Sequence, residues 1–263
     1  MYQKILYEGE GMVARFNLYV NEEQILCEKS EWDDINENNQ CIFKEKLQEI
    51  IDREEIDAKA IEDICFPNVN VHIFLSHSHL DVELAKKIAR LLYNKYGLIC
   101  FIDEELWEYA DDLLRLIDKK YCYSSDEKTY NYSQRNKTTA HVHAILQMAL
   151  AKMIDTTECF VILNTPNSIT INEMLYKSYT YSPWIYSEIL LANIIRTSIP
   201  NRQTVHEEVC FAHTDIKMRY SVNLRGFYAL TLEDLEDASS AGEYGEDLLD
   251  SLYEIMGIDA FGN

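Results

Sequence analysis

Long apolar runs are missing from this sequence. No stretch approaches the roughly 18 uninterrupted apolar residues of a membrane-spanning helix, and the first ten residues have neither a long apolar core nor the small residues of a cleavage site. We therefore expect no membrane span and no secretory signal. The 263 residues, 47% hydrophobic and 26% charged, suit a soluble globular protein with one large domain, alone or with flanking pieces.

The usual fingerprints of several site types are also absent. The chain has no P-loop, no G-x-G-x-x-G and no G-x-S-x-G, so the common nucleotide-binding loops and the nucleophile elbow are excluded. Its 7 cysteines form no C-x-x-C pair, and Cys100 and Cys159 lie within apolar runs. Reduced, mostly buried thiols are typical of a cytoplasmic protein, so we expect a cytoplasmic location.

Positive charge is scarce at both ends of the chain. Residues 1–69 carry 17 acids and 7 bases, and residues 231–263 carry 10 acids and no base, a net charge of −10 in each case. Residues 70–230 carry a net charge of only −1 out of the total of −21. Because nucleic acids and anionic membranes both require a basic face, neither is expected as a partner for the main activity.

From Asn70 onward, short apolar runs alternate with helical periodicity. Val71–Leu75, Leu98–Ile102 and Cys159–Leu163 are almost wholly apolar, as strands buried on both faces should be. The clearest helical stripe follows Thr138 and consists of Val142, Ile145, Leu146, Ala149, Leu150 and Met153. The alternation predicts an α/β fold in which a parallel sheet is covered by helices on both faces.

The same pattern suggests three parts. We expect an accessory N-terminal region over residues 1–69 and a sheet-forming domain over residues 70–230. Residues 231–263 would form an acidic, helical C-terminal extension. Within the domain, the polar stretch 121–139 is expected to be an insertion or long loop.

Polar residues follow each expected strand. Ser76 and His77 end the first strand, and Ser78 with Asp81 has the spacing of a capping box at the next helix start. Right-handed crossovers place all such loops at one edge of the sheet, where ligands bind in these folds. The free N–H groups of the helix start would hold phosphate or hydroxyl oxygens. A plain polar loop is the alternative.

A single carboxylate in an apolar helix is the second candidate. Ser182 is a suitable N-cap and Pro183 a suitable first residue, which makes Glu188 the sixth residue of the helix, too far in to cap it. Because most of its neighbours are apolar, this acid needs a partner or must face a cleft. Trp184 lies four residues earlier on the same face. The alternative is a solvent-facing acid at the helix rim.

Taken together, these segments resemble a Toll/interleukin-1 receptor (TIR) domain. Ile73–Ser78 resembles the first box of that family, and Phe101-Ile102-Asp103 resembles its second strand and the acid that follows. Ser182-Pro183-Trp184 with Glu188 resembles the motif S-x-W-C-x-x-E, with Ile185 at the cysteine position. The loop after Asp103 lacks the family's usual glycine and proline.

The resemblance covers residues 70–230 and implies a flavodoxin-like parallel sheet. It also implies cleavage of the bond between nicotinamide and ribose in NAD+, as in bacterial TIR proteins of Thoeris-type anti-phage defence. Glu188 would be the catalytic acid. Residues that bind the substrate would be Ser76, His77, Asp103, Trp107 and Trp184.

NAD+ would be a substrate, with no metal and no further cofactor. The product would be ADP-ribose or a cyclic ADP-ribose signal that a downstream effector senses. TIR–TIR contacts would join copies of the chain into a homo-oligomer. All of these statements are implied by the resemblance.

Three alternatives stay open. The first is a non-catalytic interaction module of the same fold. The second is a nucleoside enzyme of the deoxyribosyltransferase type, which also uses a glutamate, and the third is a zinc hydrolase. The spacing of His77, His79 and Asp81 matches the H-x-H-x-D of zinc hydrolases. In those enzymes a histidine follows the aspartate, whereas Val82 stands at that position here.

Overall fold

The computed structural model describes residues 11–20, 25, 46–52, 56–65, 71–102, 104–124, 128–172, 177–197, 220–240 and 242–258. Its elements, in chain order, are β1 (Ala14–Leu18), α2 (Ala58–Cys65), β2 (Ile73–Ser76), η2 (His79–Asp81), α3 (Val82–Tyr96), β3 (Cys100–Ile102), α4 (Glu104–Tyr121), β4 (Tyr123–Ser124), β5 (Thr129–Tyr130), α5 (Tyr132–Thr156), β6 (Cys159–Leu163), β7 (Thr170–Asn172), β8 (Lys177–Thr180), α6 (Pro183–Ile194), β9 (Tyr220–Val222), β10 (Tyr228–Leu230), α7 (Leu232–Ala238) and α8 (Glu246–Ile255). Residues 46–51 are also helical.

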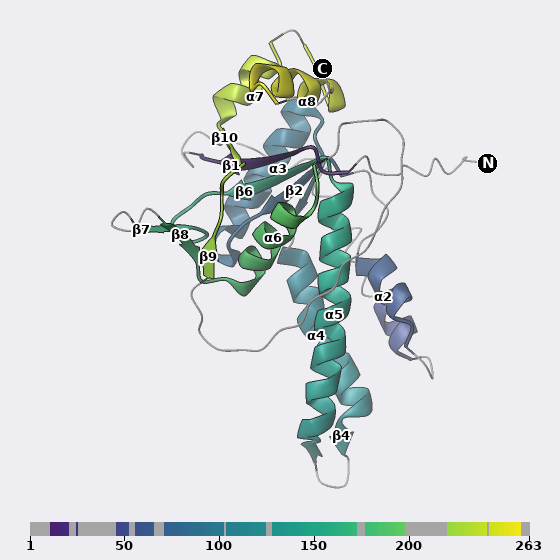
Figure 1. The fold of residues 1–263 in the computed structure, drawn as a ribbon. Helices are drawn as coiled ribbons and strands as arrows, with labels where there is room; N and C mark the ends of the chain where they lie inside the picture. The colour runs from purple at the N-terminus through teal and green to yellow at the C-terminus, as the bar shows by residue number, and fades with distance from the viewer. Residues whose placement is uncertain are drawn as a thin grey trace, which may run out of the picture.

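Five parallel strands form the central sheet in the order β10-β1-β6-β2-β3 (Figure 1). Every residue of β2 and β6 is buried. Such strands carry apolar side chains toward both faces, which explains why they appear in the sequence as continuous apolar runs. The predicted α/β architecture with a parallel sheet and flanking helices is confirmed.

The order of strands changes direction at the boundary between β2 and β6. The chain adds β3 on one side of β2 and then returns to place β6 on the other side. Ligands in open parallel sheets bind beyond the carboxyl ends of strands at such a switch point. The run β3-β2-β6 follows the order 2-1-3 of flavodoxin-like sheets, with which the architecture is compatible.

The N-terminal strand β1 lies inside this sheet. It pairs with β6 on one side and with β10 on the other, so it is not accessory to the sheet, contrary to what we expected for residues 1–69. A single buried strand gives no alternation of strand and helix, which is why the sequence pattern started at Asn70. The outer limits of the domain stay a prediction.

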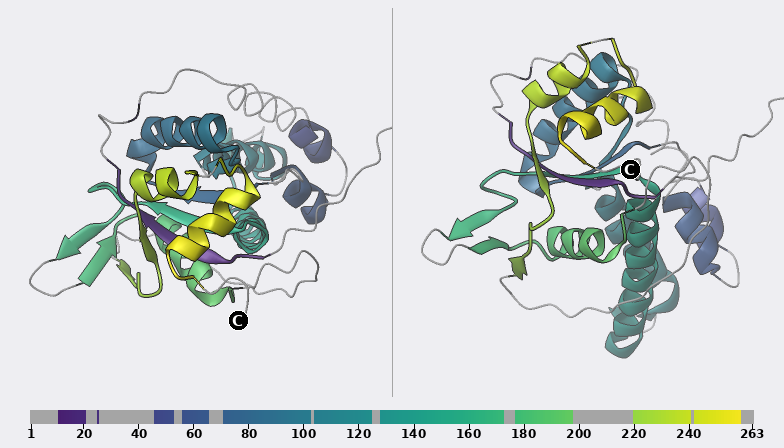
Figure 2. Two further views of the ribbon diagram at one scale, coloured as in Figure 1. Left: turned by 90° about the horizontal axis from the view of Figure 1, so that it is seen from above. Right: turned by 45° about the horizontal axis from the view of Figure 1, so that its top comes forward.

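Helices cover both faces (Figures 1 and 2). On one face, α3, α7 and α8 pack over the strands in one hydrophobic cluster. On the other face, α5 and α6 pack over Phe74, Phe160 and Ile162. The C-terminal extension, expected to be helical, contains α7 and α8 and contributes to the core.

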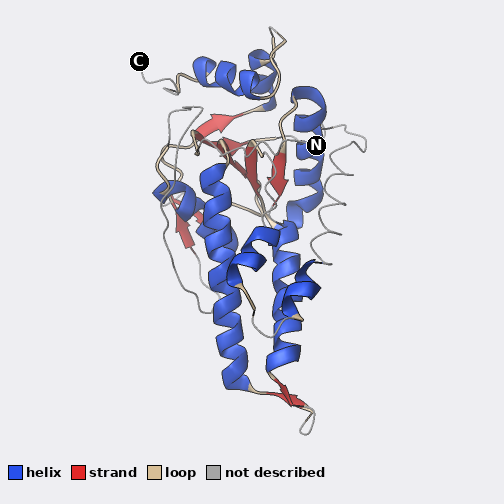
Figure 3. Ribbon diagram, turned by 90° about the vertical axis from the view of Figure 1, so that its right-hand side faces the viewer, coloured by secondary structure: helices blue, strands red, loops and turns tan. Residues whose placement is uncertain are grey.

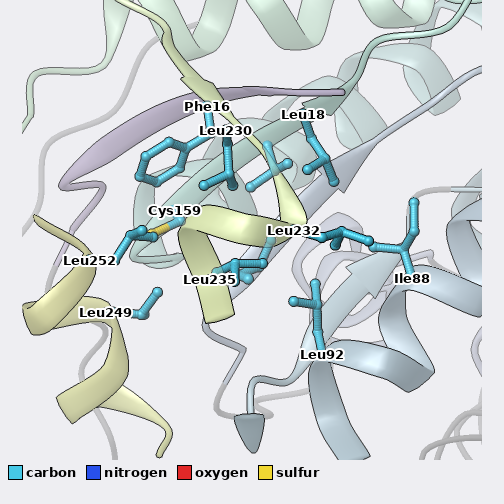
Figure 4. Close-up of a pocket in the computed structure, with 12 residues that line it drawn as sticks. Phe16, Leu18, Ile88, Leu92, Cys159, Leu230, Leu232, Leu235, Leu249 and Leu252 are labelled. Atoms are coloured by element: carbon cyan, nitrogen blue, oxygen red, sulfur yellow. The ribbon is translucent and has the colours of Figure 1, made fainter. Parts of the chain in front are cut away.

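Leucines of the two C-terminal helices reach the centre of that core. Leu235 of α7 and Leu249 and Leu252 of α8 line the same narrow apolar space as Phe16 of β1 and Leu92 of α3 (Figure 4). A buried polar contact lies beside them. The Tyr253 hydroxyl is 2.9 Å from the Cys159 thiol and donates to Glu158 at 2.9 Å. Desolvation raises the pKa of both Cys159 and Tyr253 well above their usual values, so both groups are neutral.

The thiols are as expected where the structure describes their side chains. Cys100, Cys122 and Cys159 are buried and form no disulfide. Within the part of the chain that the structure describes, no helix is both long and apolar enough to cross a membrane.

A long arm projects from the body of the molecule. Antiparallel helices α4 and α5 extend beyond the sheet and are joined at the far end by the β4–β5 hairpin (Figures 1 and 3). We expected a loop as far as Thr139, but α5 already begins at Tyr132, where Asn131 caps it by accepting from Gln134 N at 3.1 Å. Residues 132–137 are exposed all round, so this part of the helix has no apolar stripe in the sequence.

A small antiparallel sheet of β7, β8 and β9 leads into α6.

Leu252→Ala is expected to lower the free energy of unfolding by about 2–5 kcal/mol, because it enlarges an apolar space that cannot collapse fully. Ile255→Ala, in the same helix but with the side chain 54% exposed, is the matched control and should change it by about 0.5 kcal/mol or less. Chemical denaturation measures both. Equal, small effects would show that α8 does not belong to the core.

His72 precedes β2 at the opposite edge of the sheet. Its Nδ1 accepts a hydrogen bond from Ile99 N at 3.0 Å, so the ring is held as the neutral form with the proton on Nε2. Desolvation by burial lowers the pKa of His72 below its usual 6.5, and the charge of Glu246 offsets this only partly.

The unfolded chain therefore takes up a proton at His72 before the folded chain does. The contribution of His72 to the free energy of unfolding is fully present above about pH 6.5. It decreases as the pH drops toward the lowered pKa. Asparagine keeps an acceptor here but does not titrate. Between pH 7 and pH 5, the measured free energy of unfolding should decrease less in His72→Asn than in the wild type. An identical decrease in both would contradict this assignment.

Candidate functional site

Two buried polar residues lie where β2 ends and its loop begins, at the switch point of the sheet. Ser76 is 0% exposed and pairs in register with Ile162 of β6. His77 follows, also buried, with Nδ1 3.2 Å from the carbonyl oxygen of Leu75. Two polar side chains therefore lie inside the protein, where an apolar strand meets its loop.

Helix α6 begins as its sequence predicts. The Ser182 hydroxyl accepts from Ile185 N at 3.2 Å, and Pro183 is the first helical residue. The buried residues of the helix are Ile185, Ser187, Glu188, Ile189 and Ala192, and all of them except Ser187 form one stripe. This spacing of three, four and seven residues is that of one helical face. Glu188 therefore points inward because of its position in the helix.

Glu188 and Ser76 meet in the interior. The Ser76 hydroxyl donates to Glu188 Oε2 at 2.6 Å, across 112 residues of sequence, and Glu188 is 0% exposed. The acid expected to need a partner has one, at the end of β2. The alternative of a solvent-facing acid at the helix rim is wrong. A short hydrogen bond to a carboxylate is stronger than one between neutral groups.

Trp184 lies one turn before Glu188 and is half-buried. Its ring stacks on that of His143 from α5, with centroids 5.5 Å apart and planes 11° from parallel. This contact joins the amino-terminal turn of α6 to α5. His143 does not share a site with His141, whose side chain is exposed.

The loops after β2 and β6 converge as predicted, through Asp81. Its carboxylate accepts from the Thr165 hydroxyl and from Asn167 Nδ2, the latter at 2.7 Å. The predicted capping box between Ser78 and Asp81 does not form, although Ser78 still caps the short helix η2. Ser78 accepts from Leu80 N, while the Asp81 side chain makes no cap. The carboxylate instead reaches across to the neighbouring loop, an interaction that local spacing does not reveal.

The carboxyl end of β1 joins the same edge. Asn164 Nδ2 donates to Asn17 Oδ1 at 2.9 Å, and Asn17 Nδ2 donates to the Tyr19 hydroxyl at 2.7 Å. Asn17 was not predicted as a site residue because β1 itself was not predicted. The available signal was weak: Arg15 and Asn17 alternate with the apolar residues Ala14, Phe16 and Leu18.

Two predicted site residues are not placed. Asp103 lies outside the described residues, and the side chain of Trp107 is not described. The backbone places Trp107 in α4, which begins at Glu104. The roles of Asp103 and Trp107 stay predictions.

Among the described residues, no three His, Cys, Asp or Glu side chains come together as metal ligands would. The aspartate of the H-x-H-x-D spacing, Asp81, engages Thr165 and Asn167. The zinc hydrolase alternative gains no support from this geometry.

Comparison with family models, curated proteins and solved structures finds no match to this chain. The TIR resemblance therefore depends on the residues quoted above. What the structure adds is the contact between two of them, Ser76 and Glu188.

Ser76→Ala is expected to lower the free energy of unfolding by about 1–3 kcal/mol, because it removes the donor to a buried carboxylate. In a Glu188→Gln background the same change should matter less, by at least about 0.5 kcal/mol, since the two side chains interact. Ser133→Ala, at an exposed position of α5, is the control. Additive effects in a denaturation cycle would contradict the contact.

Proposed function

We propose that this protein cleaves the N-glycosidic bond between nicotinamide and ribose in NAD+, as a glycohydrolase or an ADP-ribosyl cyclase. The observation that supports it is the Ser76–Glu188 contact at the carboxyl end of β2. A carboxylate is held at the switch point of a parallel sheet, where such folds bind ligands. The two residues come from the two best-matched TIR-like segments.

The chemistry requires few groups. As the bond breaks, its electron pair moves to the pyridinium nitrogen, so nicotinamide leaves as a neutral molecule and needs no strong acid. The ribose passes through an oxocarbenium-like state. Glu188 would stabilise this positive charge and bind the ribose hydroxyls. Water at C1′ then gives ADP-ribose and a proton, whereas attack by the adenine or ribose of the same molecule gives a cyclic product.

Access to Glu188 requires a conformational step. The side chain is 0% exposed, so NAD+ reaches it only after the surrounding side chains move, as in enzymes whose sites open and close. Trp184 is half-buried one turn away and would line the opened pocket, with Ser76 and His77 on the opposite side. Asp103 and Trp107 would complete it on the nicotinamide side.

The wider role is proposed on the resemblance alone. It comprises a cytoplasmic TIR-like enzyme of bacterial antiviral defence, joined into a homo-oligomer through TIR–TIR contacts. Its product would be a nucleotide signal for a downstream effector.

A non-catalytic interaction module is the second candidate, and one observation favours it. Glu188 is wholly buried and already accepts an internal hydrogen bond, as a structural acid would. Incubation of concentrated, folded protein with NAD+ separates the two candidates. Absence of nicotinamide release there would favour the module, and cleavage of free nucleosides in preference to NAD+ would favour the deoxyribosyltransferase type.

Glu188→Gln is expected to reduce nicotinamide release by about 10²–10³-fold, because the amide cannot balance the developing positive charge. Glu233→Gln, at an exposed position of α7, should leave the rate unchanged. Mass spectrometry of the products, with circular dichroism to confirm folding, makes the measurement. A folded Glu188→Gln protein with wild-type turnover would overturn the proposal.

A further inference from the structure

The far end of the arm presents a cluster of tyrosines to solvent. Around the β4–β5 hairpin, four large aromatic side chains are 41–79% exposed: Tyr121, Tyr123, Tyr130 and Tyr132. We call residues 119–124 and 128–137 the arm tip. Exposed aromatic side chains gathered in one place are typical of surfaces that bind another molecule.

The arm tip is held in shape by its own contacts. The rings of Tyr123 and Tyr130 lie 5.2 Å apart across the hairpin. The Arg135 guanidinium lies over Tyr130 and its Nε donates to Asp118 at 2.8 Å. A hollow of about 280 Å³ lies beside these groups, lined by Leu114, Arg115, Asp118, Tyr130 and Arg135. The tip therefore offers a preformed surface with a recess.

This end of the molecule is also basic. Residues 115–140 contain 6 bases and 3 acids, a net charge of +3 in a chain with a net charge of −21. Asp118 is buried and engaged by Arg135 and Thr138. Lys119, Lys128 and Lys137 have exposed side chains. The arm tip is thus a positively charged aromatic surface on an acidic protein.

The opposite end of the molecule has complementary properties. Helices α7 and α8 lie at the far end from the arm tip (Figures 1 and 3). Residues 231–263 have a net charge of −10 with no base. The described exposed acids there are Glu233, Glu236, Asp237, Asp247 and Glu254. Tyr244 and Ile255 are 58% and 54% exposed among them. We call residues 232–240 and 242–255 the acidic end.

We propose that the arm tip of one copy docks on the acidic end of a second copy. The lysines would steer the approach and set its orientation, and the tyrosines would supply apolar contact with Tyr244 and Ile255. Because the two surfaces differ and lie at opposite ends, the contact is head to tail. Such a contact repeats, and it forms a ring if the rotation closes or a filament if it does not.

A second copy fits this surface better than a nucleic acid does. The rest of the protein is strongly acidic and would repel a polyanion, whereas the same charge forms the complementary surface in another copy. The contact involves no residue of the Ser76–Glu188 site, so it is independent of the proposed activity.

Charge reversal at each surface tests the contact by sedimentation velocity. The wild type should associate increasingly with concentration at low ionic strength, about 0.02 M, and dissociate at about 0.5 M. Lys119→Glu/Lys137→Glu and Glu233→Lys/Asp237→Lys should each weaken association by about tenfold or more, because both reduce the charge complementarity. The first changes the net charge of residues 115–140 from +3 to −1, and the second changes that of residues 231–263 from −10 to −6. Arg196→Glu/Arg225→Glu, exposed residues outside both surfaces, should associate like the wild type.

A mixture of the two reversed proteins gives the decisive result. The unchanged basic arm tip of the Glu233→Lys/Asp237→Lys protein then meets the unchanged acidic end of the Lys119→Glu/Lys137→Glu protein. Association should therefore return in the mixture. A wild type that stays monomeric at both ionic strengths would overturn the proposal, as would no recovery in a mixture of folded variants. A monomeric wild type that binds a single-stranded oligonucleotide through the arm tip would assign this surface to nucleic acid instead.

Discussion

A buried carboxylate on the inner stripe of α6 constrains the centre of this protein. Removing a charge from water is unfavourable unless the interior supplies a partner, and Ser76 at the end of β2 supplies a donor at 2.6 Å. Large neighbours on α6, above all Ile185 and Ile189, pack against the same face of the sheet. The position of α6 over the β2–β6 boundary is therefore set by packing and by one polar contact together. An apolar residue at this position would be enough for packing. The presence of an acid at the switch point is therefore the main reason to look for chemistry there.

The sheet depends on segments from both ends of the chain. β1 fills the place between β6 and β10, and helices α7 and α8 cover the face that α3 leaves open. A parallel sheet exposes apolar side chains on both faces until helices cover it, so the acidic C-terminal segment is needed for burial as well as for charge. Its helices bury leucines inward and carry their acids outward. The same two elements thereby complete the core and create an acidic surface.

The arm gives the protein a marked polarity. Helices α4 and α5 pack on each other and on the helices of residues 46–51 and 58–65 through a separate hydrophobic cluster, which leaves their far end clear of the body. Charge follows the same axis, basic and aromatic at the arm tip and acidic at α7 and α8. A molecule with different surfaces at opposite ends is suited to repeated contacts in one direction.

The sequence alone determined the local features. Apolar runs identified β2, β3 and β6, the Ser182-Pro183 pair located the start of α6, and helical spacing placed Trp184 and Glu188 on that helix. Each of these depends on residues within about two helical turns of one another, where periodicity and capping rules apply. The TIR resemblance drew on the same short segments.

Only the tertiary structure decided which distant residues meet. The insertion of β1 between β6 and β10, the reach of Asp81 to Thr165 and Asn167, and the bond between Ser76 and Glu188 all join residues more than 80 positions apart. The first two were not predicted. For the bond between Ser76 and Glu188, the sequence predicted only that both residues lie near the same edge of the sheet. Pairing of this kind is set by how helices pack on a completed sheet, and no local spacing in the chain encodes it.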